Sequence, residues 1–298
     1  MPKRKGKAAS DDEDDSGSEV DLVNVDFEFF DPRPIDYLAI KRLLRQLLQL
    51  DAEDLHVNDL ADLILSQPLV GTTVKTDGIE SDPYAFLTVL NINVHKDNSS
   101  IKALISYLLA KSAGNPTAQA ALRNIIGPEA LASSSSRHVG LLLGERMINM
   151  PVQIIPPMYR MLGDEIRMAN EDKEPYNFDY YIVLSRLYKI TEADISAMDD
   201  GTEEPAQPPK KQKKKGKGSK VKGQQLGLPK VGTFSFHHED EQIQKVATFT
   251  VDYEFSNRQP REGSESLGLD VAGRFMIVPA TRFAEMVTSM AESHPLPT

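Results

Sequence analysis

The sequence has 298 residues, of which 40% are hydrophobic and 26% are charged, as in an ordinary globular protein. No run of apolar residues is long enough to span a membrane. The N-terminal Met1-Pro2-Lys3-Arg4-Lys5 leads into acidic residues, which argues against a secretory signal. Because cysteine is absent, disulfides, thiol nucleophiles and cysteine-based zinc sites are excluded.

The net charge of −10 is unevenly distributed along the chain. Eight lysines lie within 210–222 and four basic residues within 3–7, whereas six acidic residues lie within 11–19. Outside these runs the chain holds 22 basic and 38 acidic residues, a balance of −16. Such an excess repels the backbone of a nucleic acid and attracts a basic protein, although an acidic surface also serves solubility alone.

Two segments have the composition of unfolded chain. Residues 1–20 contain almost nothing apolar and predict a disordered charged tail. Residues from about 198 to 230 are rich in proline, glycine and lysine without periodicity, which predicts a flexible insertion. The residues after it are too few to bury a large core of their own. We therefore expect 21–298 to form one domain that the insertion interrupts.

The elements follow in chain order from hydrophobic periodicity. Alternating apolar and polar residues predict a strand at 23–29, and leucines at helical spacing predict a helix at 37–50. The next predicted elements are a helix at 58–65, strands at 69–75 and 84–93, helices at 101–110 and 117–126, a buried strand at 138–144, a helix at 156–170 and a strand at 178–190. After the insertion we expect paired strands at 231–237 and 245–255, a short strand at 275–278 and a helix at 279–291. This order predicts an α+β fold with a central mixed sheet flanked by helices.

The sequence contains no phosphate-binding glycine loop, dinucleotide-binding turn, HExxH helix or nucleophile elbow. The cluster His237-His238-Glu239-Asp240-Glu241 has the chemistry of metal ligands. Adjacent residues of a strand point to opposite faces, however, which favours a polar strand end and turn over a metal site. Asp194, Asp199 and Asp200 lie in a linker, where burial cannot tune a pKa for acid–base work. We therefore predict no catalytic, cofactor-binding or metal-binding residue.

Two lysine clusters predict nuclear import or nonspecific contact with RNA, against the alternative of a solvated spacer. Aromatic residues that could stack on bases are absent from the long cluster, so we expect no specific nucleic-acid partner. Serines followed by acidic residues are candidate phosphorylation sites. The nuclear-localisation candidates are Lys3, Arg4, Lys5, Lys210, Lys211, Lys213, Lys214 and Lys215, and the phosphorylation candidates are Ser10, Ser16 and Ser18.

At several points the chain resembles the BCCIP family of eukaryotic nuclear proteins, in its fungal form. None of the matching blocks is a catalytic signature, but their order and spacing are specific. The blocks are VNVDFEFFDP (23–32), VGTTVKTDGIESDPYAFLTVLNI (70–92), VGLLLGERMINMPVQIIPPMYRML (139–162), FDYYIVLSRLYKI (178–190) and FHHEDEQIQKVATFTVDYEF (236–255).

The resemblance implies a fold similar to that of the GCN5-related acetyltransferases. It also implies a non-enzymatic nuclear chaperone for a basic large-subunit ribosomal protein, with roles in ribosome biogenesis and nuclear export, and with no cofactor and no membrane partner. A lipid kinase as export cargo and import and export receptors are further implied partners. The alternatives are a diverged acetyltransferase and an export or cell-cycle scaffold without a dedicated client. Active acetyltransferases carry an R/Q-x-x-G-x-G/A turn, which the stretch from His138 to Pro157 lacks.

Overall fold

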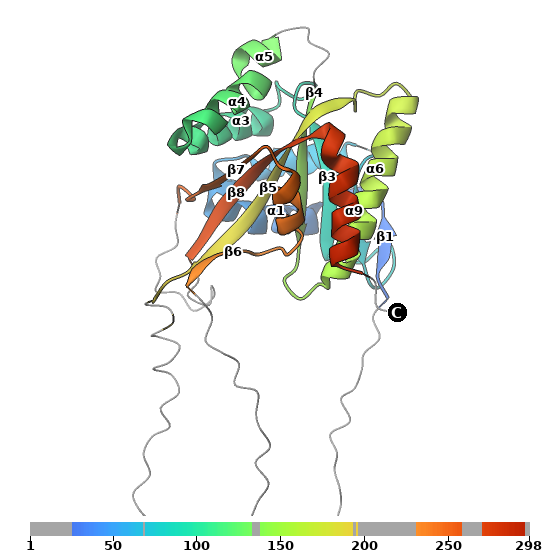
Figure 1. Cartoon of the computed structure of the whole chain (residues 1–298). Coiled ribbons are helices and arrows are strands. Elements are labelled where there is room, and N and C mark those ends of the chain that lie inside the picture. Colours follow the sequence, from blue (N-terminus) through green and yellow to red (C-terminus); the bar gives the residue numbers. More distant parts are fainter. Residues whose placement is uncertain are drawn as a thin grey trace, which may run out of the picture.

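The computed structural model describes residues 26–67, 69–132, 138–192, 195, 231–257 and 270–295. Their framework is a mixed eight-stranded sheet with helices on both faces (Figure 1). The strand order is β1-β2-β3-β4-β5-β8-β7, and β6 pairs separately with β5. No helix in this part of the chain has both the length and the apolar character needed to cross a membrane.

The first four strands of the sheet form an antiparallel meander, and one later pair of neighbouring strands is parallel. The four strands of the meander are β1 (Glu28–Phe30), β2 (Thr72–Lys75), β3 (Ala85–Asn91) and β4 (His138–Arg146). β4 pairs in parallel with β5 (Phe178–Ile190), and α6 (Ile155–Glu171) makes the crossover between them. The remaining strands are antiparallel to their neighbours: β6 (Gly232–Ser235), β7 (Phe249–Tyr253) and β8 (Asp270–Pro279).

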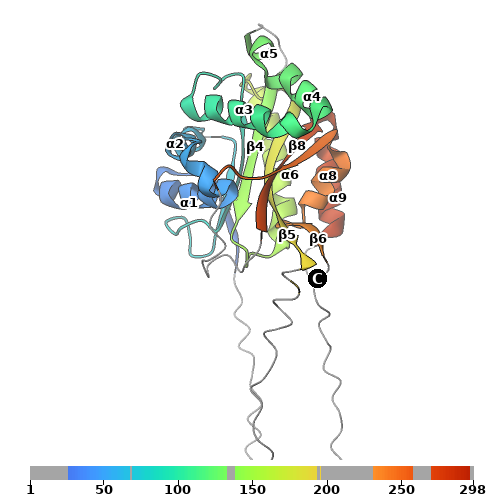
Figure 2. The same cartoon turned by 90° about the vertical axis from the view of Figure 1, so that its left-hand side faces the viewer.

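Two helical layers cover the sheet, as the edge-on view in Figure 2 shows. One layer packs its leucines and isoleucines against the odd-numbered residues of β4. Its helices are α1 (Tyr37–Leu48), α2 (Val57–Leu65), α3 (Ser99–Lys111) and α4 (Pro116–Ile126), followed by the short α5 (Pro128–Ala132). The other layer is α6 with α8 (Asp240–Val246) and α9 (Phe283–Ser293). Single 3-10 turns lie at Pro34–Asp36, Gln49–Glu53, Ser112–Gly114, Val152–Ile154 and Ala280–Arg282.

Local chemistry explains where several of these elements begin. The side chain of Asn98 accepts from the backbone N–H of Ser100 at the start of α3, and Asn115 accepts from Ala118 at the start of α4. A buried ion pair then ties α1 to the sheet: Lys75 Nζ lies 2.7 Å from Asp36 Oδ1, and the lysine side chain is 0% exposed. Removing either partner would leave an unpaired buried charge.

The mixed α/β fold predicted from the sequence is confirmed, and β5 has the predicted bounds of 178–190. Three predictions are wrong in part. Within the described residues the first strand covers only 28–30, and the last strand runs over 270–279 instead of 275–278. The stretch 245–255 is not one strand paired with 231–237, because 240–246 form α8 while β7 pairs with β8 and β6 pairs with β5. The predicted tail and insertion lie outside the described residues.

A close contact in the sheet yields the first testable prediction. A Cβ atom at Gly273 would lie 2.3 Å from the ring of Tyr253, which is itself enclosed by Tyr107, Phe255 and Phe275. We expect Gly273→Ala to lower the free energy of unfolding by about 1–3 kcal/mol, because the enclosed ring has no room to move. Urea denaturation followed by circular dichroism measures this. Gly114→Ala is the matched control, since a Cβ there meets nothing within 4 Å; equal losses for both variants would contradict the prediction.

Candidate functional site

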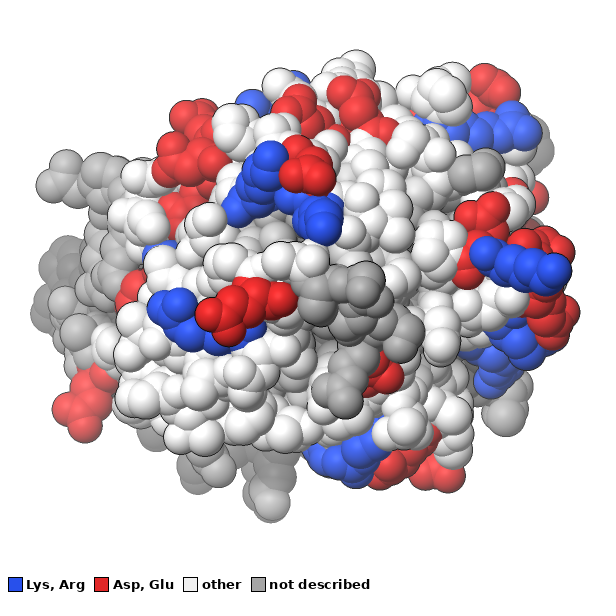
Figure 3. Space-filling model, turned by 90° about the horizontal axis from the view of Figure 1, so that it is seen from above, with Lys and Arg blue, Asp and Glu red and all other residues white. Residues whose placement is uncertain are grey.

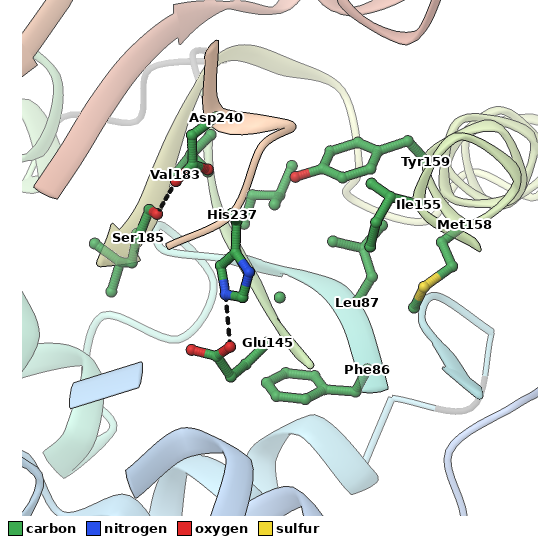
Figure 4. A pocket seen from close by; sticks show the side chains of 13 residues that line it. Phe86, Leu87, Glu145, Ile155, Met158, Tyr159, Val183, Ser185, His237 and Asp240 are labelled. Atoms are coloured by element: carbon green, nitrogen blue, oxygen red, sulfur yellow. Dashed lines mark hydrogen bonds and ion pairs between the residues drawn. The ribbon is translucent and has the colours of Figure 1, made fainter. Parts of the chain in front are cut away.

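The most polar region of the interior lies where β4 and β5 cease to pair. Their parallel ladder runs from His138↔Phe178 to Leu142↔Val183 and stops. Beyond that point β6 takes over the pairing with β5, from Leu187 to Ile190. In open α/β sheets a ligand commonly binds in such a crevice at the carboxyl ends of parallel strands. Here the turn that leads from β6 into α8 lies in the crevice and carries His237 and Asp240 into it (Figure 4).

Glu145, at the end of β4, is the centre of this region. Its carboxylate is fully buried and is contacted by three polar side chains, each from a different element. His237 Nε2 lies 2.6 Å from Oε1, Arg186 Nε donates to Oε2 at 2.9 Å, and Gln46 Nε2 donates to Oε1 at 3.1 Å. Burial by itself would raise the pKa of Glu145, but the charges of His237 and Arg186 and their hydrogen bonds outweigh it and lower the pKa to about 2.

The same turn makes two further buried contacts. Arg146 Nη2 donates to Glu239 Oε2 at 2.9 Å, and the hydroxyl of Ser185 donates to Asp240. Burial raises the pKa of Asp240 to about 7, with Glu239 adding to the rise, while His237, Ser185 and Arg274 oppose it. We call Glu145, Arg146, Ser185, Arg186, His237, Glu239 and Asp240 the buried polar cluster.

The surroundings of His237 favour its protonated form. Burial would lower its pKa, but the neighbouring carboxylates Glu145, Glu239 and Asp240 prevail and raise it above the ordinary value. Its other ring nitrogen, Nδ1, is buried without a hydrogen-bond partner, as is Nε of Arg146. The turn is therefore anchored through one nitrogen of this imidazole, while the second faces the adjoining cavity.

That cavity is small. Its volume is about 30 Å³, room for a water molecule or two, whereas sites for organic ligands are roughly tenfold larger. Polar groups from β4, β5 and the turn meet apolar side chains of α6 across it (Figure 4). The labelled residues around it are Phe86, Leu87, Glu145, Ile155, Met158, Tyr159, Val183, Ser185, His237 and Asp240.

The start of α6, which follows β4 and faces the crevice, is poorly equipped to hold a phosphate. A helix binds phosphate through the free backbone N–H groups of its first turn. Pro156 and Pro157 have no N–H, and the N–H of Ile155 is already bonded to the carbonyl of Val152. The sequence lacks a glycine-rich phosphate-binding turn here, and the first three residues of α6 likewise offer no free backbone N–H group.

The residues His237 to Glu241, whose composition resembles that of a metal site, lie at a turn and contribute buried ion pairs. A turn does follow β6, as predicted, but His237, Glu239 and Asp240 are buried ion partners of β4 and β5. Among the described residues no group of three or more histidine, aspartate or glutamate side chains is arranged to hold a metal. The sequence did contain a signal for this burial: Glu145-Arg146 ends an otherwise apolar strand, and Arg186 lies inside another.

The predicted site residues cannot be placed beside this cluster. Every nuclear-localisation candidate and every phosphorylation candidate lies outside the described residues, as do Asp194, Asp199 and Asp200. The acidic balance of the folded part can be assessed, since the described residues hold 18 basic and 30 acidic side chains. Seen from above, the molecule shows acidic and basic side chains interspersed among wide uncharged areas (Figure 3).

The fold and the buried polar cluster define a mixed α/β protein in which interior ionic contacts fasten a C-terminal segment into the sheet. The chain belongs to the BCCIP family, whose model matches residues 22–243. It is 42% identical to "Protein bcp1" of Emericella nidulans over 94% of this chain and 90% of that protein. The identity to "Protein bcp1" of Schizosaccharomyces pombe is also 42%, over 92% and 91%. The crystal structure of BCP1 from Saccharomyces cerevisiae has the same fold, with a TM-score of 0.58 and 24% identity over 93% of this chain and 92% of that one.

The buried polar cluster generates a prediction about pH. The folded-state pKa of His237 is raised, so its contribution to stability is complete below the unfolded value of about 6.5 and is lost as pH rises through the folded value. Asp240 acts in the same direction, because its pKa of about 7 in the folded state exceeds its ordinary value and the folded protein holds that proton longer. We expect the free energy of unfolding to fall between about pH 5 and pH 7, where Asp240 of the unfolded chain has lost its proton and the folded protein still holds it, by at least about 1.4 kcal/mol.

The change Asp240→Asn tests the cause of this fall, since asparagine has no proton to lose in that range. We expect the variant to show a smaller loss of stability between the two pH values, measured by urea denaturation with circular dichroism. Asp164→Asn, at an exposed position of α6, is the control and should leave the loss unchanged. The same pH dependence in all three proteins would show that the buried polar cluster does not cause it.

Proposed function

We propose that this chain is a non-enzymatic nuclear chaperone and adaptor that binds a basic large-subunit ribosomal protein and supports its handling during ribosome biogenesis and nuclear export. Membership of the BCCIP family supports the proposal through the resemblance described above. The lysine clusters at 3–5 and 210–215 support nuclear localisation by their composition. The described residues contribute to the proposal mainly by showing which surface could contact the client.

One observation carries the proposal of a basic client. Between Gln46 and His95, a stretch of 50 residues, the only lysine or arginine is Lys75, and it is buried in the pair with Asp36. The same stretch exposes seven carboxylates on η2, α2 and the β2–β3 loop: Glu53, Asp54, Asp59, Asp62, Asp77, Glu80 and Asp82. No exposed cation within this stretch offsets them. A concentrated field of one sign steers an oppositely charged partner and fixes its orientation.

The alternative of a diverged acetyltransferase has less support. The crevice between β4 and β5 contains the chain's own turn, the cavity beside it is about 30 Å³, and the first turn of α6 has no free N–H for a pyrophosphate. We therefore expect calorimetric titration with acetyl-CoA to show no saturable binding at about millimolar ligand. A dissociation constant in the micromolar range would restore the enzyme hypothesis.

The client proposal predicts a characteristic dependence on salt. Purification from nuclei with mass spectrometry identifies the ribosomal protein, and association kinetics are then measured with the purified pair. Raising salt from about 0.05 to about 0.5 M shortens the Debye length from roughly 14 to roughly 4 Å, which removes long-range steering. We expect the association rate to fall at least about tenfold and the dissociation rate to change much less, because apolar contacts hold the complex once formed.

Variants of the full chain locate the effect. Neutralising Glu53, Asp62 and Glu80, which are exposed and without ion pairs to described residues, should lower the association rate at low salt several-fold. Neutralising Glu174, Asp179 and Glu292, also exposed, is the matched control and should change it little. A histone serves as an unrelated basic protein. Equal affinities for the histone and the ribosomal protein, or complete release of the ribosomal protein at about 0.5 M salt, would contradict a dedicated chaperone.

A further inference from the structure

Helix α1 presents a positive surface to solvent, although the described residues together carry more acidic than basic side chains. Its inner side is wholly buried and consists of Ala39, Ile40, Leu43, Leu44, Leu47 and Leu48. Its outer side carries Leu38, which is 72% exposed, together with exposed Arg42 and Arg45 and half-buried Lys41. Figure 2 shows α1 at the outside of its layer, on the opposite side of the sheet from α9.

Two other exposed apolar residues lie near the ends of α1. Ile35, at 50% exposure, lies in the 3-10 turn that leads into the helix. Ile148, at 76%, belongs to the loop after β4. That loop begins beside the C-terminal half of α1, because Gln46 Nε2 donates to the carbonyl of Arg146, the last residue of β4, at 2.8 Å. We call Ile35, Leu38, Lys41, Arg42, Arg45 and Ile148 the α1 patch. Leu38 lies one helical turn from Lys41 and Arg42 on the same side of α1, and an exposed apolar residue rimmed by charges is typical of interaction sites.

The cations of the α1 patch have few partners within the protein. Lys41 and Arg45 make no ion pair with any described residue, although Lys41 lies over the ring of Tyr37. Arg42 lies 3.5 Å from Asp82, and both side chains are largely exposed, a geometry that contributes little to stability. These three cations precede a stretch of 50 residues without any exposed lysine or arginine. Intramolecular salt bridges therefore do not account for this local positive charge in an acidic protein.

We propose that the α1 patch binds an acidic segment of a partner protein that presents apolar side chains on one face of a helix. Guanidinium groups pair with carboxylates in a bidentate geometry, and Leu38 and Ile148 give apolar side chains a surface to cover. A nucleic acid fits less well, because its phosphate backbone presents no apolar side chains to cover Leu38 and Ile148. This surface adjoins the acidic one proposed for a basic client at the Arg42–Asp82 pair.

A peptide of about 18 residues tests the proposal, with leucine at helical i, i+3, i+4 and i+7 spacing and glutamate elsewhere. Its binding to the full chain is measured by fluorescence anisotropy at about 0.1 M salt. We expect the triple variant Lys41→Gln, Arg42→Gln, Arg45→Gln to bind it at least about tenfold more weakly. Leu38→Ser with Ile148→Ser should weaken binding at least about fivefold while leaving its salt dependence unchanged.

The matched control neutralises exposed cations of other helices, in the variant Lys102→Gln, Arg123→Gln, Arg160→Gln, and should bind the peptide like the wild type. Circular dichroism verifies that every variant is folded. Equal weakening by the control, or displacement of the peptide by single-stranded RNA of similar length, would overturn the proposal. A tenfold gain in affinity after neutralising Asp11–Asp15 in the full chain would assign the patch to the chain's own acidic segment and overturn a partner in trans.

Discussion

A carboxylate removed from water is stable only where cations and donors surround it, and Glu145 meets that requirement with side chains from three other elements. Gln46 comes from α1, Arg186 from β5 and His237 from the turn before α8. Each of these elements must therefore occupy one position relative to the end of β4. The consequence reaches the C-terminal strands, because the turn held by Glu145 leads through α8 into β7, which pairs with β8 beside β5.

The same contacts decide what the crevice between β4 and β5 can do. In an open α/β sheet this position is available to a ligand, but here the ionic partners of β4 and β5 come from the chain itself. The prolines at the start of α6 remove the donors that a phosphate would need. Both features support the proposal that the protein acts through its outer surface, where charge is separated between the cations of α1 and the carboxylates that follow it in the sequence.

Two proposals rest on that separation, and they concern different partners. The stretch from Gln46 to His95 exposes only carboxylates, while the helix before it exposes Lys41, Arg42 and Arg45 beside apolar residues. A basic client and an acidic segment would therefore use surfaces of opposite sign that adjoin at the Arg42–Asp82 pair. Electrostatic steering governs the encounter in both cases, and buried apolar contacts govern the lifetime of each complex.

Hydrophobic periodicity determined α1, because its buried residues recur at helical spacing. Length and a content of tyrosine and β-branched residues determined β5, which is buried without alternation over most of its length. Neither signal revealed α8, a helix of seven residues that begins with charged groups, or the ten-residue length of β8. The composition also determined the acidic balance and the lack of a catalytic motif. Only the tertiary structure decided that Glu145, Arg186 and His237 meet in the interior. Arg186 and His237 follow Glu145 in the chain by 41 and 92 positions, and the folding of the sheet brings them together. No local sequence pattern specifies which buried charges form a pair.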